Sequence, residues 1–135
     1  MAITVALVLA VLALLHVYWG VVGIGGRSVA LPEVEGKPLF IPSRAATFAV
    51  AAGLSAAALL LLWRGGYLPL LLPPQVTKVG TLGVGLLFVA RAIGDFRFVG
   101  LFKRVRGTPF AIWDSRLFSP LSLAIGLGSL WVAYR

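Results

Sequence analysis

The chain alternates long apolar runs with short polar segments, and four of the runs are long enough to cross a lipid bilayer. A helix rises about 1.5 Å per residue, so roughly 20 apolar residues span a hydrocarbon core of about 30 Å. Four segments meet this requirement, at residues 2–24, 45–63, 75–94 and 117–134. The pattern predicts an all-α fold, an integral membrane four-helix bundle that forms a single transmembrane domain over residues 1–135.

The polar segments between the runs predict turns, one short helix and the start of the fourth span. Gly and Pro punctuate the first two segments, which is typical of loops. The third carries apolar residues at helical spacing, Phe98, Leu101, Phe102 and Val105. Basic residues surround them, so the spacing predicts a short interfacial amphipathic helix between spans three and four.

At the start of the fourth span, Ser119 followed by Pro120 predicts a helix cap with proline in the first turn.

Composition confirms the membrane class and narrows the chemistry. The chain is 60% hydrophobic with a mean hydropathy of +1.02, far outside the usual range of soluble proteins. Its net charge of +8 indicates membrane orientation and attraction to anionic head groups more than binding of nucleic acid. There is no cysteine and one histidine, so neither a thiolate site nor a multi-histidine metal site is available within one chain. We expect no cofactor, no metal and no nucleic-acid partner.

Basic residues are distributed unevenly between the two sides of the predicted bundle. Nine lie in the first and third loops and their flanks: Arg27, Lys37, Arg44, Arg91, Arg97, Lys103, Arg104, Arg106 and Arg116. The other side holds Arg64, Lys78 and Arg135. The positive-inside rule then predicts a multi-pass protein of the cell membrane, the inner membrane in bacteria, with both termini outside. The expected partners are membrane lipids, with anionic head groups at the cytoplasmic face meeting Arg97, Lys103, Arg104 and Arg106.

Ionisable and aromatic residues predict a polar pocket at the cytoplasmic end. A charge at the centre of a span costs about 2.5 to 3.5 kcal/mol on insertion scales, so such residues usually face protein or water. Arg91 precedes Asp95 by four residues, which predicts a pair on one helix face, with Asp114 as a further partner. The residues expected around the pocket as ligand-binding groups are His16, Tyr18, Trp19, Arg91, Asp95, Trp113, Asp114 and Arg116. We expect His16 to contact Arg91, Asp95 and Asp114; the alternative is a histidine satisfied by one hydrogen bond to Ser, Thr or backbone.

Small residues follow one face of the second span. Ala45, Ala49, Gly53 and Ala57 recur at four-residue spacing. Small faces let helix backbones approach closely in a membrane, where lipid supplies no hydrophobic drive for association. The face therefore predicts helix packing within the bundle, and the alternative is a homodimer contact.

Two motifs and the proline-bearing first loop between them carry a family resemblance. The chain, with "HVYWGVVGIGG" near its start and "FVARAIGDFRFVGLFKRVRGTPFAIWDSRLFSPLSL" toward its end, resembles the bacterial membrane proteins grouped as domain of unknown function 3995 (DUF3995) over nearly its whole length. The resemblance implies four spans and supplies no activity. It singles out His16, Tyr18, Trp19, Gly25, Gly26, Arg91, Gly94, Asp95, Arg97, Gly100, Phe102, Asp114, Ser119 and Pro120. A cysteine often found after the Ser-Pro-Leu element is Ser122 here, so a role for a thiol is not expected.

Three functions fit these residues. The first is a small protein that binds or transports a lipid-like or small anionic ligand in the cytoplasmic-end pocket, since intramembrane ionisable residues mark ligand or proton paths. The second is a structural or accessory subunit, in which a buried pair such as Arg91 and Asp95 fixes helix register without chemistry. The third is a lipid-modifying enzyme with His16 as general acid or base, oriented by Asp95 or Asp114.

Overall fold

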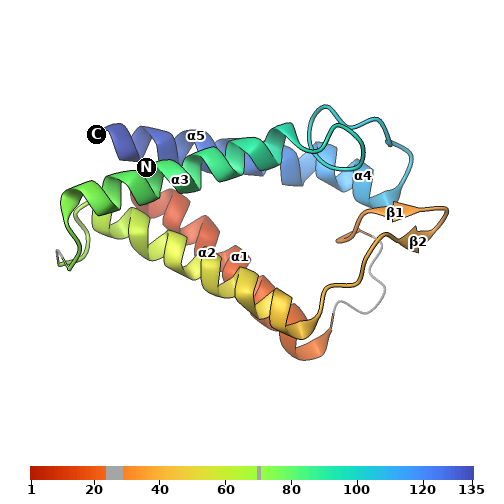
Figure 1. The fold of residues 1–135 in the computed structure, drawn as a ribbon, viewed down its shortest axis with the longest axis horizontal. Coiled ribbons are helices and arrows are strands. Elements are labelled where there is room, and N and C mark those ends of the chain that lie inside the picture. The colour runs from red at the N-terminus through yellow and green to blue at the C-terminus, as the bar shows by residue number, and fades with distance from the viewer. Residues whose placement is uncertain (24–28, 70) are drawn as a thin grey trace.

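Four membrane-spanning helical segments form two antiparallel pairs that meet at one end of the molecule and diverge toward the other (Figure 1). The computed structural model describes residues 1–23, 29–69 and 71–135. Its helices are α1 (Ala2–Val22), α2 (Arg44–Arg64), α3 (Pro74–Ile93), α4 (Pro109–Trp113), the π-helical turn η1 (Asp114–Phe118) and α5 (Ser119–Tyr134). The last three run on continuously as the fourth span. α1 packs along α2 and α3 packs along α5, so the two pairs enclose a V.

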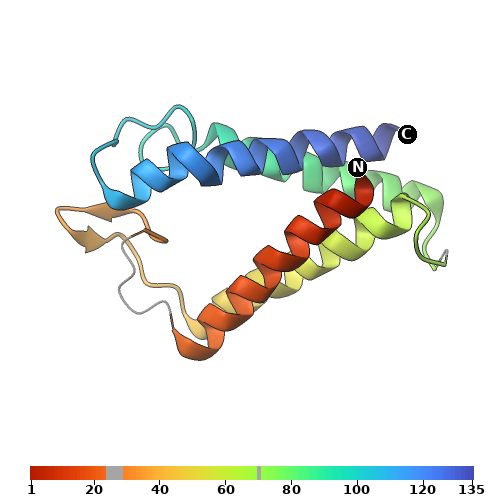
Figure 2. The same ribbon diagram turned by 180° about the vertical axis from the view of Figure 1, so that it is seen from behind.

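The apolar core fills the narrow half of the V. Leu9 of α1 and Leu61 of α2 are fully buried and belong to one cluster with Ile125 and Val132 of α5. At the narrow tip, Arg64 donates from Nε and Nη2 to the carbonyl oxygen of Ala133, at 3.3 and 2.9 Å. A cation near the last carbonyls of a helix is favourable because those groups carry partial negative charge. Both termini lie at this end, as Figure 2 shows from behind.

Contact between α3 and α5 depends on two facing glycines. A Cβ added at Gly85 would lie 2.7 Å from the Leu130 side chain and 3.1 Å from the carbonyl oxygen of Gly126. One added at Gly126 would lie 2.8 Å from Val89. Glycine at both positions lets the two backbones touch, which is how membrane helices associate without a hydrophobic drive.

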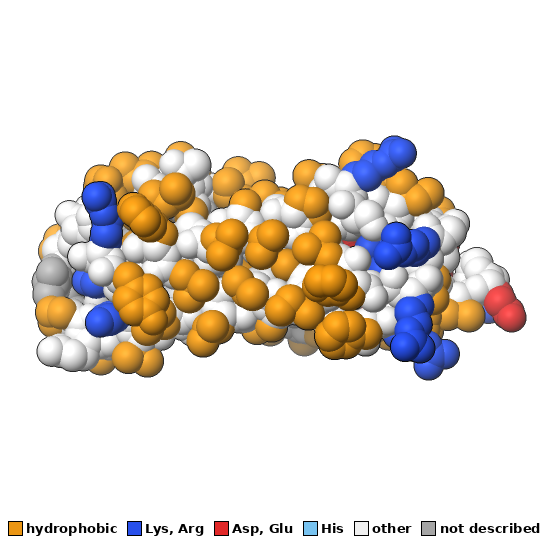
Figure 3. Space-filling model, turned by 90° about the horizontal axis from the view of Figure 1, so that it is seen from above, with side chains coloured by type: hydrophobic (Ala, Val, Ile, Leu, Met, Phe, Trp, Pro, Cys, Tyr) orange, Lys and Arg blue, Asp and Glu red, His pale blue; other side chains and the backbone are white. Residues whose placement is uncertain are grey.

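The lengths and surfaces of the helices confirm a four-span membrane protein. α1, α2 and α3 begin and end within two residues of the predicted limits, the first of which placed the end of a span at residue 24. That residue, together with Gly25, Gly26 and Arg27, lies outside the described residues. Figure 3 shows apolar side chains over the middle of one face and Lys and Arg side chains gathered toward its ends. This arrangement matches a hydrocarbon layer bounded by two polar interfaces.

The fourth span begins eight residues earlier than predicted, at Pro109 instead of residue 117. Ser119 is not a helix cap, because the helix passes through it and its hydroxyl donates to Asp114. Proline inside a helix removes one hydrogen bond and its ring crowds the carbonyl four residues earlier. The wider turn η1, in which the Ser119 N–H donates to the Asp114 carbonyl, lets the helix continue past Pro120.

Two features of the connecting segments also differ from prediction. No helix forms around Phe98 to Val105; residues 94–108 make an irregular loop, because glycines with positive φ and a capping carboxylate turn the backbone away from helical geometry. The loop between α1 and α2 contains a small antiparallel hairpin, β1 (Glu33–Val34) with β2 (Lys37–Pro38). Positive φ at both Glu35 and Gly36 is what a tight two-residue hairpin turn requires.

The small-residue face of α2 is mostly unpacked. Ala57 is buried, but Ala45, Ala49 and Gly53 are exposed, so the expected packing of the whole face within the bundle is wrong. The reason is the divergence of the two helix pairs, which leaves the N-terminal part of the face without a helix of the other pair opposite it. The homodimer contact stays a prediction.

Cysteine labelling tests the predicted orientation, because the chain has no native cysteine. Gly107 lies in the exposed loop at the wide end and Gln75 is exposed at the narrow end. With both termini outside, an impermeant thiol reagent applied to intact cells should label Gln75→Cys and leave Gly107→Cys unmodified until the cells are lysed. The opposite pattern would show that the nine-to-three distribution of basic residues has been assigned to the wrong sides.

Candidate functional site

The carboxylate of Asp114 is the centre of a buried polar network. It is fully buried and accepts four hydrogen bonds. Oδ1 accepts from Arg91 Nη2 at 2.8 Å, and Oδ2 accepts from the Gly100 backbone N–H at 2.8 Å, Lys103 Nζ at 2.9 Å and Ser119 Oγ at 3.0 Å. One side chain therefore joins α3, the 94–108 loop and the fourth span. The predicted pair of Arg91 with Asp114 is present.

The network lies near the boundary of the membrane. Twenty residues separate Asp114 from Tyr134, about 30 Å of helix, which is the thickness of the hydrocarbon core. Arg91 lies two residues before the end of α3, at the same end of the bundle. Paired charges at this level avoid most of the cost of a charge at mid-membrane.

The predicted place of Lys103 at the lipid head groups is wrong. The residue is buried, with only 2% of its surface exposed. Its Nζ donates to the Gly100 carbonyl at 2.9 Å and to Ser115 Oγ at 2.7 Å besides the Asp114 carboxylate. All three ammonium hydrogens can thus be used inside the protein. The other three bases of the loop, Arg97, Arg104 and Arg106, are exposed.

The predicted pair of Arg91 with Asp95 is also wrong. α3 ends at Ile93 and Gly94 adopts a φ of 85°, so Asp95 is not on the helix face of Arg91 and the i to i+4 argument does not apply. Its Oδ1 instead accepts the backbone N–H groups of residues 97, 98 and 99 at 2.9, 2.7 and 2.9 Å. Slight burial raises the pKa of this exposed carboxyl, but the backbone donors outweigh it and hold the pKa below its ordinary value. The residue stabilises the loop and forms no ion pair with Arg91, whose carboxylate partner is Asp114.

A cavity of about 500 Å³ lies between the two helix pairs. All four spans contribute to its walls, and most of the lining side chains are apolar. Its ionisable lining residues are His16 of α1 and Arg91 of α3, and Ser122 of α5 borders it as well. The cavity therefore has an apolar body with polar groups on opposing helix pairs.

His16 is satisfied locally. Its Nδ1 lies 2.7 Å from the carbonyl oxygen of Leu12, one turn earlier in α1, and its ring meets that of Trp19 edge-on at 5.1 Å. Within the described part of the chain it forms no hydrogen bond or ion pair with Arg91, Asp95 or Asp114, so the expected contact is not made. The structure shows the alternative, a histidine bonded to backbone, although His16 and Arg91 share one cavity.

The charges of the network do not balance. Arg91 and Lys103 carry two positive charges and share the single carboxylate of Asp114. In addition, Arg91 Nη1 is buried without a hydrogen-bond partner, whereas the side chain as a whole is 34% exposed. An unsatisfied buried donor costs about 1 to 3 kcal/mol. The cavity wall thus carries a net positive charge and a donor that lacks an acceptor.

The other predicted site residues lie apart from this arrangement. Tyr18, Trp113 and Arg116 are exposed and do not line the cavity. Conversely, Gly100 and Ser119 belong to the network but were missed as site residues, and Lys103 was assigned to the lipid interface instead. The family resemblance included Gly100 and Ser119 without indicating what they do, and the predicted helix cap gave Ser119 a different role.

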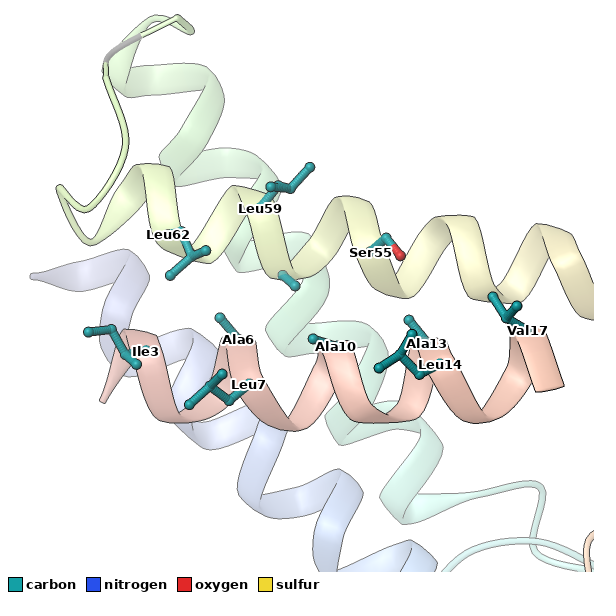
Figure 4. Close-up of a pocket in the computed structure, with 11 residues that line it drawn as sticks. Ile3, Ala6, Leu7, Ala10, Ala13, Leu14, Val17, Ser55, Leu59 and Leu62 are labelled. Carbon is teal, nitrogen blue, oxygen red and sulfur yellow. The ribbon is translucent and has the colours of Figure 1, made fainter.

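A second cavity, of about 450 Å³, is a groove between α1 and α2 (Figure 4). Ala6, Ala10 and Ala13 form its floor on α1, and leucines flank it on both helices. Its one polar side chain, Ser55, donates its hydroxyl to the Ala51 carbonyl at 2.9 Å. The only polar atom that the lining side chains of the groove offer a ligand is therefore the Ser55 hydroxyl oxygen, which can still accept.

Comparison with known proteins places the chain in a family. The profile of the family described as "Protein of unknown function (DUF3995)" matches residues 9–129. The chain belongs to this family, as the sequence motifs predicted. No curated protein and no solved structure was found to match it.

Proposed function

We propose that this member of the DUF3995 family binds an anionic, lipid-like molecule in the cavity between its two helix pairs. The observation that carries the proposal is the excess positive charge at the wall of a mostly apolar cavity. Charges in a low-dielectric environment attract strongly, and a ligand site is typically an apolar cavity with a few placed polar groups. An acyl chain would occupy the apolar body while its acidic head meets Arg91.

Arg91 is suited to this role because Asp114 holds only part of its guanidinium. Nη2 bonds to Asp114 Oδ1, which fixes the side chain, and Nη1 is left without an acceptor. One-third of the side chain is exposed, so a modest shift brings Nη1 to an incoming oxygen. A charge-assisted hydrogen bond to phosphate or carboxylate is stronger than one between neutral groups.

The network also favours a structural role for Asp114, which coexists with ligand binding. Its four hydrogen bonds come from three separate elements, and breaking such a buried network is costly. The enzyme alternative lacks this support. Asp95 and Asp114 are both committed to other donors, so neither orients His16 as a general acid or base.

Filling the cavity tests the proposal without touching the ion pairs. Gly53 of α2 and Gly83 of α3 are both helical glycines with nothing within 4 Å of an added Cβ, but only Gly53 lines the cavity. Both substitutions to leucine should keep or raise stability, since leucine favours helix over glycine by almost 1 kcal/mol. Gly53→Leu should lose a co-purifying acidic lipid that wild type and Gly83→Leu retain, as native mass spectrometry of the detergent-solubilised protein measures.

The polar end of the site is tested in the same assay by Arg91→Gln. Its control is Arg116→Gln, which removes an exposed arginine outside both the cavity and the ion pairs. Acidic lipid should be lost from the first variant only. Equal retention of acidic lipid by Gly53→Leu, Gly83→Leu and wild type would contradict the proposal whether or not Arg91→Gln folds.

A further inference from the structure

The hydrogen bond of His16 fixes which ring nitrogen carries a proton. The carbonyl oxygen of Leu12 can only accept, so the Nδ1 that lies 2.7 Å from it must be the donor. In the neutral ring the proton on Nδ1 leaves Nε2 as a bare acceptor. Nε2 has no hydrogen-bond partner within the described part of the chain, and the ring borders the cavity. The residues that line the cavity therefore include a histidine with an unused acceptor on α1 and an arginine with an unused donor on α3.

The charge count limits the head group further. Arg91, Lys103 and Asp114 sum to one positive charge, and no acidic side chain lines the cavity. A single negative charge neutralises this excess. A zwitterionic head group would leave the excess in place overall, and a dianion would bring a second, unpaired charge into a region of low dielectric.

We infer that the ligand carries one negative charge and a hydroxyl group in its head, with the anionic oxygen at Arg91 and the hydroxyl donating to His16 Nε2. This inference rests on the ligand binding proposed above. A phosphodiester lipid with a glycerol head group has this chemistry, and so has a fatty acid with a hydroxyl group beside its carboxylate. Both supply an acceptor for the arginine and a donor for the histidine, joined to a chain that fits the apolar body of the cavity.

The test compares lipids that differ only in the hydroxyl. Phosphatidylglycerol and phosphatidylmethanol carry the same single charge, and a β-hydroxy fatty acid is matched by the unsubstituted acid of equal length. Phosphatidylcholine is the zwitterionic reference. Affinities of the full chain in nanodiscs, from competition followed by native mass spectrometry, should favour the hydroxylated member of at least one pair about three- to tenfold, the range that one net hydrogen bond supports.

Two His16 variants complete the experiment. His16→Phe keeps an aromatic ring beside Trp19 but has no acceptor, and it should abolish the hydroxyl preference, which is the ratio of the two affinities within one lipid pair. His16→Gln has a carbonyl oxygen and should restore part of the preference. The pair that shows the preference identifies whether the anion is a phosphodiester or a carboxylate.

The failures are distinguishable. Equal affinities within both pairs, or an undiminished preference in His16→Phe, would overturn the inference and leave anionic-lipid binding intact. If none of the anionic lipids binds better than phosphatidylcholine, the proposed function itself fails, and with it the inference.

Discussion

Replacing Asp114 by asparagine should lower the free energy of unfolding by about 3 to 5 kcal/mol, the usual cost of removing one partner from a buried charged network. The change leaves Lys103, 2% exposed, and Arg91 without a carboxylate. Asparagine cannot take over, because one of its terminal atoms is an NH₂ donor. All the atoms that face the two carboxylate oxygens are themselves donors, so that NH₂ group would oppose at least one of them.

Thermal unfolding in detergent measures the effect, with Asp95→Asn as the matched control. The asparagine at position 95 keeps an oxygen at the place of Oδ1, and asparagine is a good capping residue in turns. The unfolding midpoint should fall by about 10 °C or more for Asp114→Asn and by far less for Asp95→Asn. Equal midpoints in the two variants would show that the Asp114 network does not hold the fold together.

Replacing Gly100 by alanine should cost at least about 2 kcal/mol, because two separate penalties coincide there. Gly100 has a φ of 95°, a region that residues with a Cβ rarely occupy, and the added Cβ would overlap the carbonyl oxygen of Ile93 and approach Gly94 Cα. The backbone must move to relieve this contact. That movement pulls the Gly100 N–H away from Asp114 Oδ2 and so weakens the network as well.

Gly107→Ala is the control for this prediction. It lies in the same loop, its φ is not positive, and nothing lies within 4 Å of an added Cβ. Its unfolding midpoint should stay close to that of wild type, as for most exposed substitutions. If Gly100→Ala unfolds at the same temperature as Gly107→Ala, the loop is not held as the structure shows.

The number of spans and the limits of the first three were predictable because lipid leaves the backbone few options. Without water to bond to, a crossing segment must be helical and apolar along its length, and both properties are visible in the sequence. How the helices meet is not visible in this way. The divergence of the pairs depends on which side chains let backbones touch, and the Gly85 and Gly126 contact can be recognised only once the helices are placed.

The site was predictable in part. Arg91 and Asp114 pair as expected, because an unpaired charge in a membrane segment is costly and a partner on another helix lowers that cost. Lys103 was assigned to the surface because it lies among three other bases in a segment whose apolar spacing resembles a helix. The segment is not helical, because Asp95 and the glycines bend the backbone, so the apolar spacing does not define a face. No local pattern distinguishes Lys103, the one buried base, from its neighbours.

The π-helical turn in the fourth span determines how the face that carries Asp114 is rotated relative to the face that carries Gly126. At the first residue of the turn, Asp114 must face Arg91; after the turn, Gly126 must face Gly85. The π-helical turn places one extra residue in the helix between Asp114 and Gly126. One residue corresponds to about 100° of rotation about the helix axis, so the turn changes by that angle the direction in which one residue points relative to the other. A helical wheel drawn through residues 109–134 at constant pitch therefore assigns one of the two faces wrongly. One residue inserted or deleted in this stretch would rotate one face against the other by about 100°, so the ion pair and the glycine contact could not both form.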